Sequence, residues 1–156
     1  MSFHSNYNEW KEMNELENCP VCNSDSMPEG MIDLYELEHS WLNSEPVECM
    51  KWACHVTAKY HGPELHDLKE EELFGFMKDL QIYSKALKEV TSAVKINYEI
   101  HGNTLPHLHV HLYPRTMDDP FPGKPIDYDE KRDDIYEEGE YDGFVKKMRQ
   151  KLASMD

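Results

Sequence analysis

Three histidines occupy alternate positions in the segment LPHLHVHLYPR, residues 105–115, and their type and spacing suit them to chemistry. Single aliphatic residues separate His107, His109 and His111, and side chains that alternate along a strand share one face. Such a row of imidazoles can bind a metal, relay protons, or supply a nucleophile that its neighbours assist. The alternative is a half-buried strand whose polar face happens to consist of histidine.

The histidine row lies in the second strand of a predicted β-hairpin. Residues 95–100 alternate between polar and apolar side chains, Gly102 and Asn103 mark a turn, and residues 108–113 alternate again. Pro106 has no backbone N–H to donate, so it fits only at the start or the edge of a strand. We expect the aliphatic side chains to anchor the second strand in the core and the imidazoles to line an exposed groove.

Further elements are predicted before this hairpin. A long helix is expected over Leu68–Val94, because its apolar residues recur at spacings of three and four. Asp67 is the expected N-cap, and Glu70 is expected to complete a capping box. The stretch Val47–His61 is rich in residues that favour strands and predicts one strand that ends near Lys59.

The length of 156 residues fits one domain with a substantial core, over residues 1–156. Within it we expect an N-terminal segment with a C-x-x-C motif over 1–30. Residues 116–156 should form a proline-rich arm, an acidic stretch and a short helix over Phe144–Met155. In the acidic stretch, Pro125–Asp142, nine of eighteen residues are Asp or Glu. That stretch is either a solvated surface or an acidic recognition segment.

The charge balance excludes several classes of partner. Lys and Arg number 16 against 31 Asp and Glu, which gives a net charge of −15. Binding to nucleic-acid polymers or to anionic membranes requires clustered cations, so we expect neither. A small anionic ligand stays possible, because one local set of donors is enough to hold it. We see no signal peptide and no apolar run long enough to span a membrane, and we expect a cytoplasmic protein with reduced cysteines.

These motifs resemble the histidine triad (HIT) superfamily, whose signature is His-φ-His-φ-His-φ-φ with φ hydrophobic. The segment HLHVHLY, residues 107–113, matches every position. The resemblance covers about residues 19–126 and includes CPVC at 19–22, AKYHGPELHDLKEEEL at 58–73 and DDPFPGKP at 118–125. It is to a bacterial branch of the family that is similar to dinucleoside polyphosphate hydrolases and carries an N-terminal C-x-x-C.

The resemblance implies both a fold and an activity. The fold would be α+β, with an antiparallel sheet of about five strands, one long helix and a short C-terminal helix. The activity would be that of a nucleotide hydrolase or nucleotidyltransferase that acts at the α-phosphorus and needs no catalytic metal. His109 would attack and form a nucleotidyl-histidine, from which water releases the nucleoside monophosphate. The expected substrates are dinucleoside polyphosphates, with nucleoside phosphoramidates close behind, and the expected assembly is a homodimer.

Other residues receive roles from the same resemblance. His111 would donate a hydrogen bond to the phosphate or to the leaving group, and His107 would orient its neighbours. Asn103 is a candidate substrate contact. Arg115 is either a phosphate contact or an ordinary surface charge, and His101 lies either at the rim of the site or on the surface.

One departure from the family pattern leaves rival functions open. Many members carry a fourth histidine on the strand before the helix, and the aligned position here is Ala53. His55 lies two residues further on, projects to the same face, and could take its place. Without a functional fourth histidine, the protein could be a non-catalytic nucleotide-binding module. A zinc-dependent interaction protein, with the acidic stretch as its working surface, is the second rival.

The cysteines raise the question of a metal. Cys19 and Cys22 form C-x-x-C, which either supplies two ligands of a tetrahedral zinc site or is a pair of reduced thiols in a turn. A redox motif is disfavoured, since no thioredoxin-like βαβ pattern surrounds it. Resemblance to zinc-bearing members implies that His61 and His107 complete a structural zinc site. In that arrangement His107 cannot also transfer protons in the reaction, and the catalytic work falls on the other two histidines of the row.

Overall fold

An antiparallel sheet of five strands forms the centre of the fold, in the order β1-β2-β3-β5-β4. The computed structural model describes residues 2–24, 30–127 and 129–155. Each strand is hydrogen-bonded to its neighbours in the antiparallel sense. The strands are β1 Ile32–Glu36, β2 Ser40–Ser44, β3 Cys54–Ala58, β4 Lys95–Glu99 and β5 His109–Arg115.

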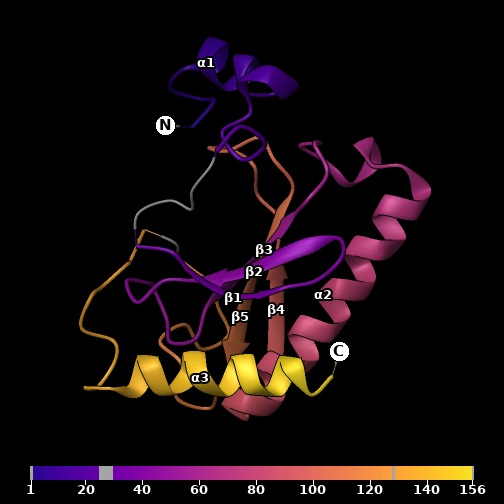
Figure 1. Cartoon of the computed structure of the whole chain (residues 1–156). Helices are drawn as coiled ribbons and strands as arrows, with labels where there is room; N and C mark the ends of the chain where they lie inside the picture. The colour runs from indigo at the N-terminus through magenta and orange to yellow at the C-terminus, as the bar shows by residue number, and fades with distance from the viewer. Residues whose placement is uncertain (1, 25–29, 128, 156) are drawn as a thin grey trace.

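Helices surround the sheet on several sides (Figure 1). The long helix α2 runs alongside the sheet, α3 crosses beneath it and contacts both α2 and β1, and the N-terminal α1 lies at the opposite end. Within the part of the chain that the structure describes, no helix is long and apolar enough to cross a membrane. The helices are α1 Tyr7–Glu12, α2 Glu70–Thr91 and α3 Glu140–Ala153, with single 3-10 turns at η1 Leu16–Asn18 and η2 Leu65–Asp67.

The α+β fold with an antiparallel sheet, a long helix and a short C-terminal helix is thereby confirmed, and the predicted hairpin is β4 and β5. The aliphatic side of β5 enters the core as expected. Val110 and Leu112 are fully buried and belong to one apolar cluster with Phe76, Tyr83 and Leu87 of α2. Apolar burial of this kind is what fixes the position of β5 between its neighbours.

The start of α2 differs from the prediction. Asp67 does not cap α2; it ends the 3-10 turn η2, where its carboxylate accepts the backbone N–H of Glu64 at 3.1 Å. Helix α2 begins after Lys69, whose backbone N–H donates to the carboxylate of Glu72 at 2.9 Å. Glu72 therefore performs the role predicted for Glu70, because the intervening 3-10 turn moves the helix start along the chain.

Residues in the left-handed backbone region set three boundaries that the sequence patterns misplaced. Ser92, with φ 57°, ends α2 before its predicted end. Trp52, with φ 65°, interrupts the stretch predicted to be one strand from Val47, so that β3 begins only after it. Gly139, with φ 74°, directly precedes α3, which therefore begins earlier than the predicted Phe144. Such conformations are uncommon outside glycine, and side-chain periodicity does not reveal them.

We expect truncation of the buried face of β5 to destabilise the fold. Leu112→Ala should lower the free energy of unfolding by about 2–5 kcal/mol, because it removes a fully buried side chain and leaves a cavity. Leu16→Ala is the matched control: that side chain is 58% exposed, and its loss should change stability by less than about 0.5 kcal/mol. Urea titration followed by circular dichroism measures both, and equal effects would contradict this description of the core.

Candidate functional site

His109 and His111 lie on the side of β5 opposite to the core, whereas His107 precedes the strand, so the three do not form the exposed row that the alternation predicts. His107 is 1% and His111 is 6% exposed, and only His109 is partly open. His107 turns toward the cysteines near the N-terminus, whereas His109 and His111 line a pocket. The row is thus divided between two neighbouring sites.

The pocket has a volume of about 1160 Å³. Its wall comes from strands β1, β2 and β3, from the turn between β4 and β5, and from the segment around the C-x-x-C motif. The predicted site residues His55 and Asn103 line it together with His109 and His111, and so does His101, which therefore belongs to the site rim. This volume is somewhat larger than the roughly 300–1,000 Å³ that is typical of small-molecule sites.

His109 has one ring nitrogen anchored to the backbone. Its Nδ1 lies 2.7 Å from the carbonyl oxygen of His107, and a carbonyl only accepts, so Nδ1 carries a proton. Burial lowers the pKa of His109, more strongly than the hydrogen bond to His107 raises it. A neutral ring with a proton on Nδ1 has its lone pair on Nε2, and this is the form that can act as a nucleophile.

His111 faces a second histidine across the strand pair. In the register of β3 and β5 it lies opposite His55, and the two Nδ1 atoms are 3.1 Å apart. Burial, followed by the charges of His55 and His109, lowers the pKa of His111 to about 2, so this ring is neutral near pH 7. The other nitrogen of His55, Nε2, is 2.9 Å from a carboxylate oxygen of Glu48.

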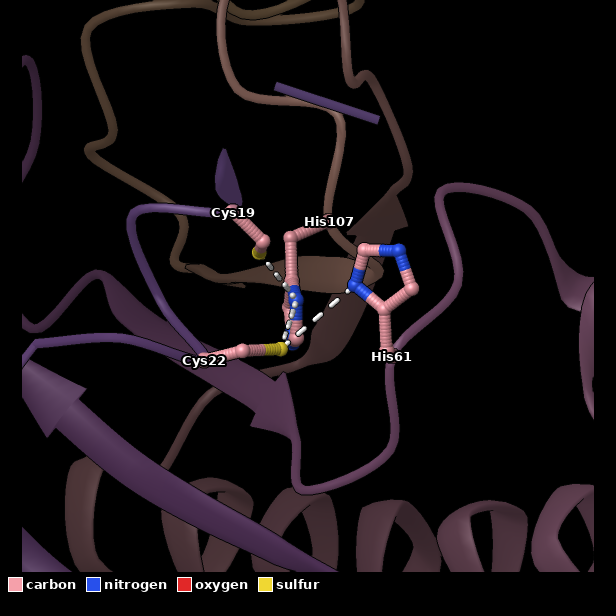
Figure 2. Close-up of side chains that lie close together, drawn as sticks. All are labelled: Cys19, Cys22, His61 and His107. Atoms are coloured by element: carbon pink, nitrogen blue, oxygen red, sulfur yellow. Dashed lines mark hydrogen bonds between the residues drawn. The ribbon is translucent and has the colours of Figure 1, made fainter. Parts of the chain in front are cut away.

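A second cluster lies beside the pocket, at the start of the histidine row (Figure 2). Cys19, Cys22, His61 and His107 turn their side chains toward one another, and all four potential ligand atoms lie within 4.8 Å of each other. The Nδ1 of His107 is 3.3 Å from the Cys19 sulfur and 3.7 Å from that of Cys22. The Nδ1 of His61 is 3.5 Å from the Cys22 sulfur.

The geometry of this cluster fits zinc. Bonds of about 2.3 Å to sulfur and about 2.0–2.1 Å to nitrogen hold tetrahedral ligand atoms about 3.3–3.8 Å apart. The three sulfur–nitrogen distances of 3.3, 3.5 and 3.7 Å fall within that range. His107 and His61 each donate their Nε2–H to a backbone carbonyl, of Ala58 at 2.8 Å and of Asn14 at 2.7 Å. Each Nδ1 therefore keeps its lone pair toward the centre of the cluster, as zinc-ligating histidines require.

Two predicted site positions lie elsewhere. Arg115 is not among the described residues that line the pocket; its guanidinium pairs with both carboxylate oxygens of Asp119 at 2.8 Å. Ala53 is buried in a small apolar cluster with Tyr113 and Phe121, so it presents no group to the site. His55 is therefore the histidine that β3 contributes to the pocket.

Sequence patterns missed several residues of the site. Glu48, fully buried behind His55, carried no periodic signal, because it lies in the irregular segment before β3. Asp33, Tyr35 and Trp41 line the pocket from β1 and β2. The sequence over residues 31–42 mixes strand and turn signals, and only the pairing of β1 with β2 across the sheet reveals which side chains reach the pocket.

Comparison with known proteins identifies the family and the fold. The model of the HIT domain matches residues 34–118. The search of curated proteins gave no match to this sequence. Among solved structures, a histidine triad protein from Bradyrhizobium japonicum is 24% identical with a TM-score of 0.71, over 81% of this chain and 97% of that one.

Two further structures share the fold. A Zn-bound histidine triad family protein from Mycobacterium smegmatis is 22% identical with a TM-score of 0.64, over 91% of this chain and 98% of that chain. A hypothetical histidine triad nucleotide-binding protein from Sulfolobus tokodaii strain 7 is 20% identical with a TM-score of 0.65, over 88% and 91%. At these identities the likeness concerns the fold.

We expect the protein to bind one zinc ion per chain at the Cys–His cluster. Cys22→Ser should lower zinc affinity by at least ~10-fold, since loss of a direct ligand costs no less than loss of a ligand's outer hydrogen-bond partner. Cys54→Ala is the control, because that thiol is buried in the sheet core, and the variant should retain its zinc. Metal content after dialysis against a chelator, measured by mass spectrometry, tests this ligand set. Equal zinc retention by the wild type, Cys22→Ser and Cys54→Ala would refute it.

Proposed function

Because the chain belongs to the HIT domain family, whose members are generally nucleotide-binding hydrolases or transferases, we propose that it cleaves nucleotides at the α-phosphorus through His109. The observation that carries this proposal is the contact between His109 Nδ1 and the His107 carbonyl, at 2.7 Å. It assigns the proton to Nδ1 and leaves Nε2 as the nucleophile. The lowered pKa of His109, caused mainly by burial, keeps the ring uncharged near neutral pH.

The proposed reaction has two steps. In the first, His109 Nε2 attacks the α-phosphorus, the bond to the leaving group breaks, and the leaving group takes a proton from a donor in the pocket. In the second, water attacks the same phosphorus, the bond to Nε2 breaks, and the nucleoside monophosphate departs with the oxygen of the water, while a proton of the water returns to the donor that lost one in the first step. Both steps build negative charge on the phosphoryl oxygens, which neighbouring donors stabilise.

His111 is the proposed donor to the phosphate or to the leaving group. Its ring centroid lies 5.0 Å from that of His109, and both rings line the pocket. His107 acts in this scheme through its carbonyl, which orients His109, rather than as a proton carrier. Asn103 and His55 line the same pocket and complete the proposed substrate contacts.

The charges around the pocket favour one of the two expected substrate classes. Two carboxylates, Asp33 and Glu36, are among the described residues that line it, and none of those residues is Lys or Arg. Glu36 is ionised, because the hydrogen bond and charge of Lys59 lower its pKa, but the Lys59 ammonium at 2.6 Å offsets its charge. Asp33 accepts a hydrogen bond from the amide of Asn43 at 2.6 Å and forms no ion pair among the described residues, so it would repel a polyphosphate chain more than a single substituted phosphate. We thus place nucleoside phosphoramidates ahead of dinucleoside polyphosphates.

Zinc has a structural role in this proposal. Cys19 and Cys22 would bind it with His61 and His107, which fills all four positions of a tetrahedral site with protein ligands. The residues between and after the two cysteines, Pro20, Val21 and Ser24, line the pocket. A bound zinc ion would therefore hold one wall of the pocket against the strand that carries His109, and would take no part in the reaction.

The remaining proposals concern assembly and location. Strand β4 forms one edge of the sheet, and Tyr98 and Ile100 at that edge are 50% and 43% exposed. A second copy could extend the sheet there and cover these side chains, so we propose a homodimer through β4. All four cysteines are free, which supports a reducing compartment such as the cytoplasm.

We expect the protein to have twice its chain mass of 18.4 kDa in solution, and Tyr98→Arg to shift it toward the single chain. A buried arginine without a partner would oppose association across β4. Phe74→Arg is the matched control, since that side chain is 64% exposed on α2 and should not affect association. Light scattering coupled to gel filtration gives the masses; a wild type of single-chain mass would contradict the dimer.

We expect a covalent nucleotide adduct on the wild type that His109→Ala abolishes, with at least a ~10²-fold loss of turnover, because the variant has no nucleophile at that position. Labelled adenosine phosphoramidate and a labelled dinucleoside polyphosphate would each be mixed with enzyme and quenched in denaturant. Intact mass then reports the adduct. His66→Ala is the control, since its side chain is 82% exposed, and it should behave as the wild type.

The outcomes of this experiment separate the rival functions. Faster adduct formation from the phosphoramidate would support the substrate order argued from the pocket charges. Equal product from the wild type and His109→Ala would overturn the nucleophile. Nucleotide that binds without adduct or product would point to a binding module. Absence of nucleotide affinity, with a partner that binds only the zinc-loaded protein, would point to an interaction protein.

A further inference from the structure

A buried chain of three titratable side chains leads from the interior to the pocket. Glu48 Oε1 is 2.9 Å from His55 Nε2, and His55 Nδ1 is 3.1 Å from His111 Nδ1. The side chains of Glu48 and His55 are 0% and 3% exposed, and His111 is 6% exposed. His111 lines the pocket, so the chain ends where the proposed reaction takes place.

The carboxylate end of the chain is ionised. Burial raises the pKa of Glu48, but the hydrogen bond and charge of His55, together with the charge of Lys131, outweigh it and hold the pKa below its usual range. The backbone N–H of Cys49 also donates to Glu48 Oε2, at 3.1 Å. An ionised carboxylate only accepts hydrogen bonds, so His55 Nε2 carries a proton.

The contact between the two rings determines which nitrogen of His111 reaches the pocket. Only one proton can lie between the two Nδ1 atoms, which are 3.1 Å apart. Whichever ring carries that proton, it ties Nδ1 of His111 to His55 and leaves Nε2 as the nitrogen that His111 offers in the pocket. Burial, followed by the charges of His55 and His109, lowers the pKa of His111 to about 2, so this ring is uncharged near neutral pH.

We propose that Glu48 and His55 are positioning residues, which hold the His111 ring by its Nδ1 and leave Nε2 as the nitrogen that it offers in the pocket. This inference rests on the proposed function, because it specifies which nitrogen of His111 meets the phosphate or the leaving group. The logic is that of a carboxylate that orients a catalytic imidazole, with one more ring inserted between them. A donor held in advance costs no reorganisation when charge develops on the phosphoryl oxygens.

The acidic stretch closes the buried end of this chain. The Lys131 ammonium is 2.5 Å from Glu45 and 3.6 Å from Glu48, and Glu48 and Arg132 exchange backbone hydrogen bonds at 3.2 and 3.1 Å. Glu45, Glu48 and His55 lie close enough together to ligate a cation, but Lys131 already places its charge between the two carboxylates. We therefore assign the cluster to positioning rather than to a second metal.

Other charged and titratable groups near His111 are compatible with this arrangement. His109 and His101 are ring neighbours of His111, with centroid distances of 5.0 and 5.4 Å, and His101 is paired with Glu99 at 3.0 Å. The Tyr113 hydroxyl is 3.5 Å from His111 Nδ1, a longer contact than the one from His55. Since a hydroxyl can donate or accept, it is compatible with the proton on either ring of the His55–His111 contact.

Nitrogen-15 NMR of the histidine rings of the zinc-loaded wild type tests the proton arrangement directly. We expect a proton on His55 Nε2 and one proton between the Nδ1 atoms of His55 and His111 at pH 7. In Glu48→Gln, whose amide can donate as well as accept, we expect a mixture of His55 tautomers and a shift of the His111 ring resonances. A wild type with no proton on His55 Nε2, or with none between the two Nδ1 atoms, would overturn the inference. This measurement needs no variant, so a misfolded variant cannot obscure it.

Kinetics tests what the arrangement does. For adenosine phosphoramidate, Glu48→Gln should lower kcat by at least ~10-fold and change KM by less than about twofold. The expected loss in kcat is a part of the roughly 10²–10⁴-fold that general acid catalysis contributes, because the variant misplaces the donor without removing it. Glu140→Gln is the matched control: Glu140 pairs with Lys51 at 2.6 Å, outside the pocket, and should keep the wild-type kcat. Thermal denaturation of both variants checks that they are folded.

The outcomes distinguish this inference from the proposed function. An unchanged kcat in folded Glu48→Gln would overturn the positioning role even if the wild type forms the adduct. A raised KM with unchanged kcat would also overturn it, because it would place Glu48 in substrate binding. A wild type that forms no adduct would instead overturn the proposed function, while the ring protonation measured by NMR would still decide the arrangement of the three side chains.

Discussion

The antiparallel register between β3 and β5 is the constraint on which the rest of the site depends. It pairs His55 with His111 and Val56 with Val110, so that imidazoles meet on one face and aliphatic side chains on the other. A shift of one residue would exchange the two faces of β5 and put its histidines in the core. Burial of Val110 and Leu112 against α2 makes that shift costly, so the same apolar packing that stabilises the sheet also aligns the reactive groups.

Backbone carbonyls determine the chemistry of the imidazoles that this register brings together. His107 and His61 give their Nε2–H to carbonyl oxygens and turn Nδ1 toward the cysteines, whereas His109 gives its Nδ1–H and keeps Nε2 for the pocket. The same side chain thus adopts opposite tautomers at different positions, because a different ring nitrogen meets the backbone carbonyl. Among the residues that the structure describes, every buried side-chain nitrogen and oxygen has a hydrogen-bond partner, which leaves the rings little freedom to rearrange.

The charge of the whole protein differs from the charge of the side chains that line the pocket. A net charge of −15 makes the protein strongly acidic, yet the polar groups that line the pocket are mainly imidazoles and amides, and no Lys or Arg is among the described lining residues. Burial lowers the pKa of His109 and of His111, because it disfavours the charged form of the ring. Within the acidic stretch, Lys131 and Arg132 fold back against the segment around Glu48, so this stretch also supports the interior of the site.

The sequence by itself determined the elements whose signals are local. Alternation over 108–113 identified the strand and its two faces, the spacing of apolar residues identified α2, and C-x-x-C identified the metal-binding candidate. Resemblance to a family, rather than spacing, implied His61 and His107 as the other two ligands. Where a boundary depended on a left-handed residue such as Trp52, the patterns failed, because backbone conformation at a single position leaves no periodic trace.

Only the tertiary structure decided which distant side chains meet. Cys19 and His107 are 88 positions apart, and the register of the sheet and the path of the N-terminal segment bring them within 3.3 Å. Glu48 entered the site in the same way, from an irregular segment that shows no pattern of its own, since its partners His55 and Lys131 come from β3 and from the acidic stretch. Periodicity reports the direction in which a side chain points, whereas its partner depends on how the elements pack, and packing is a property of the whole chain.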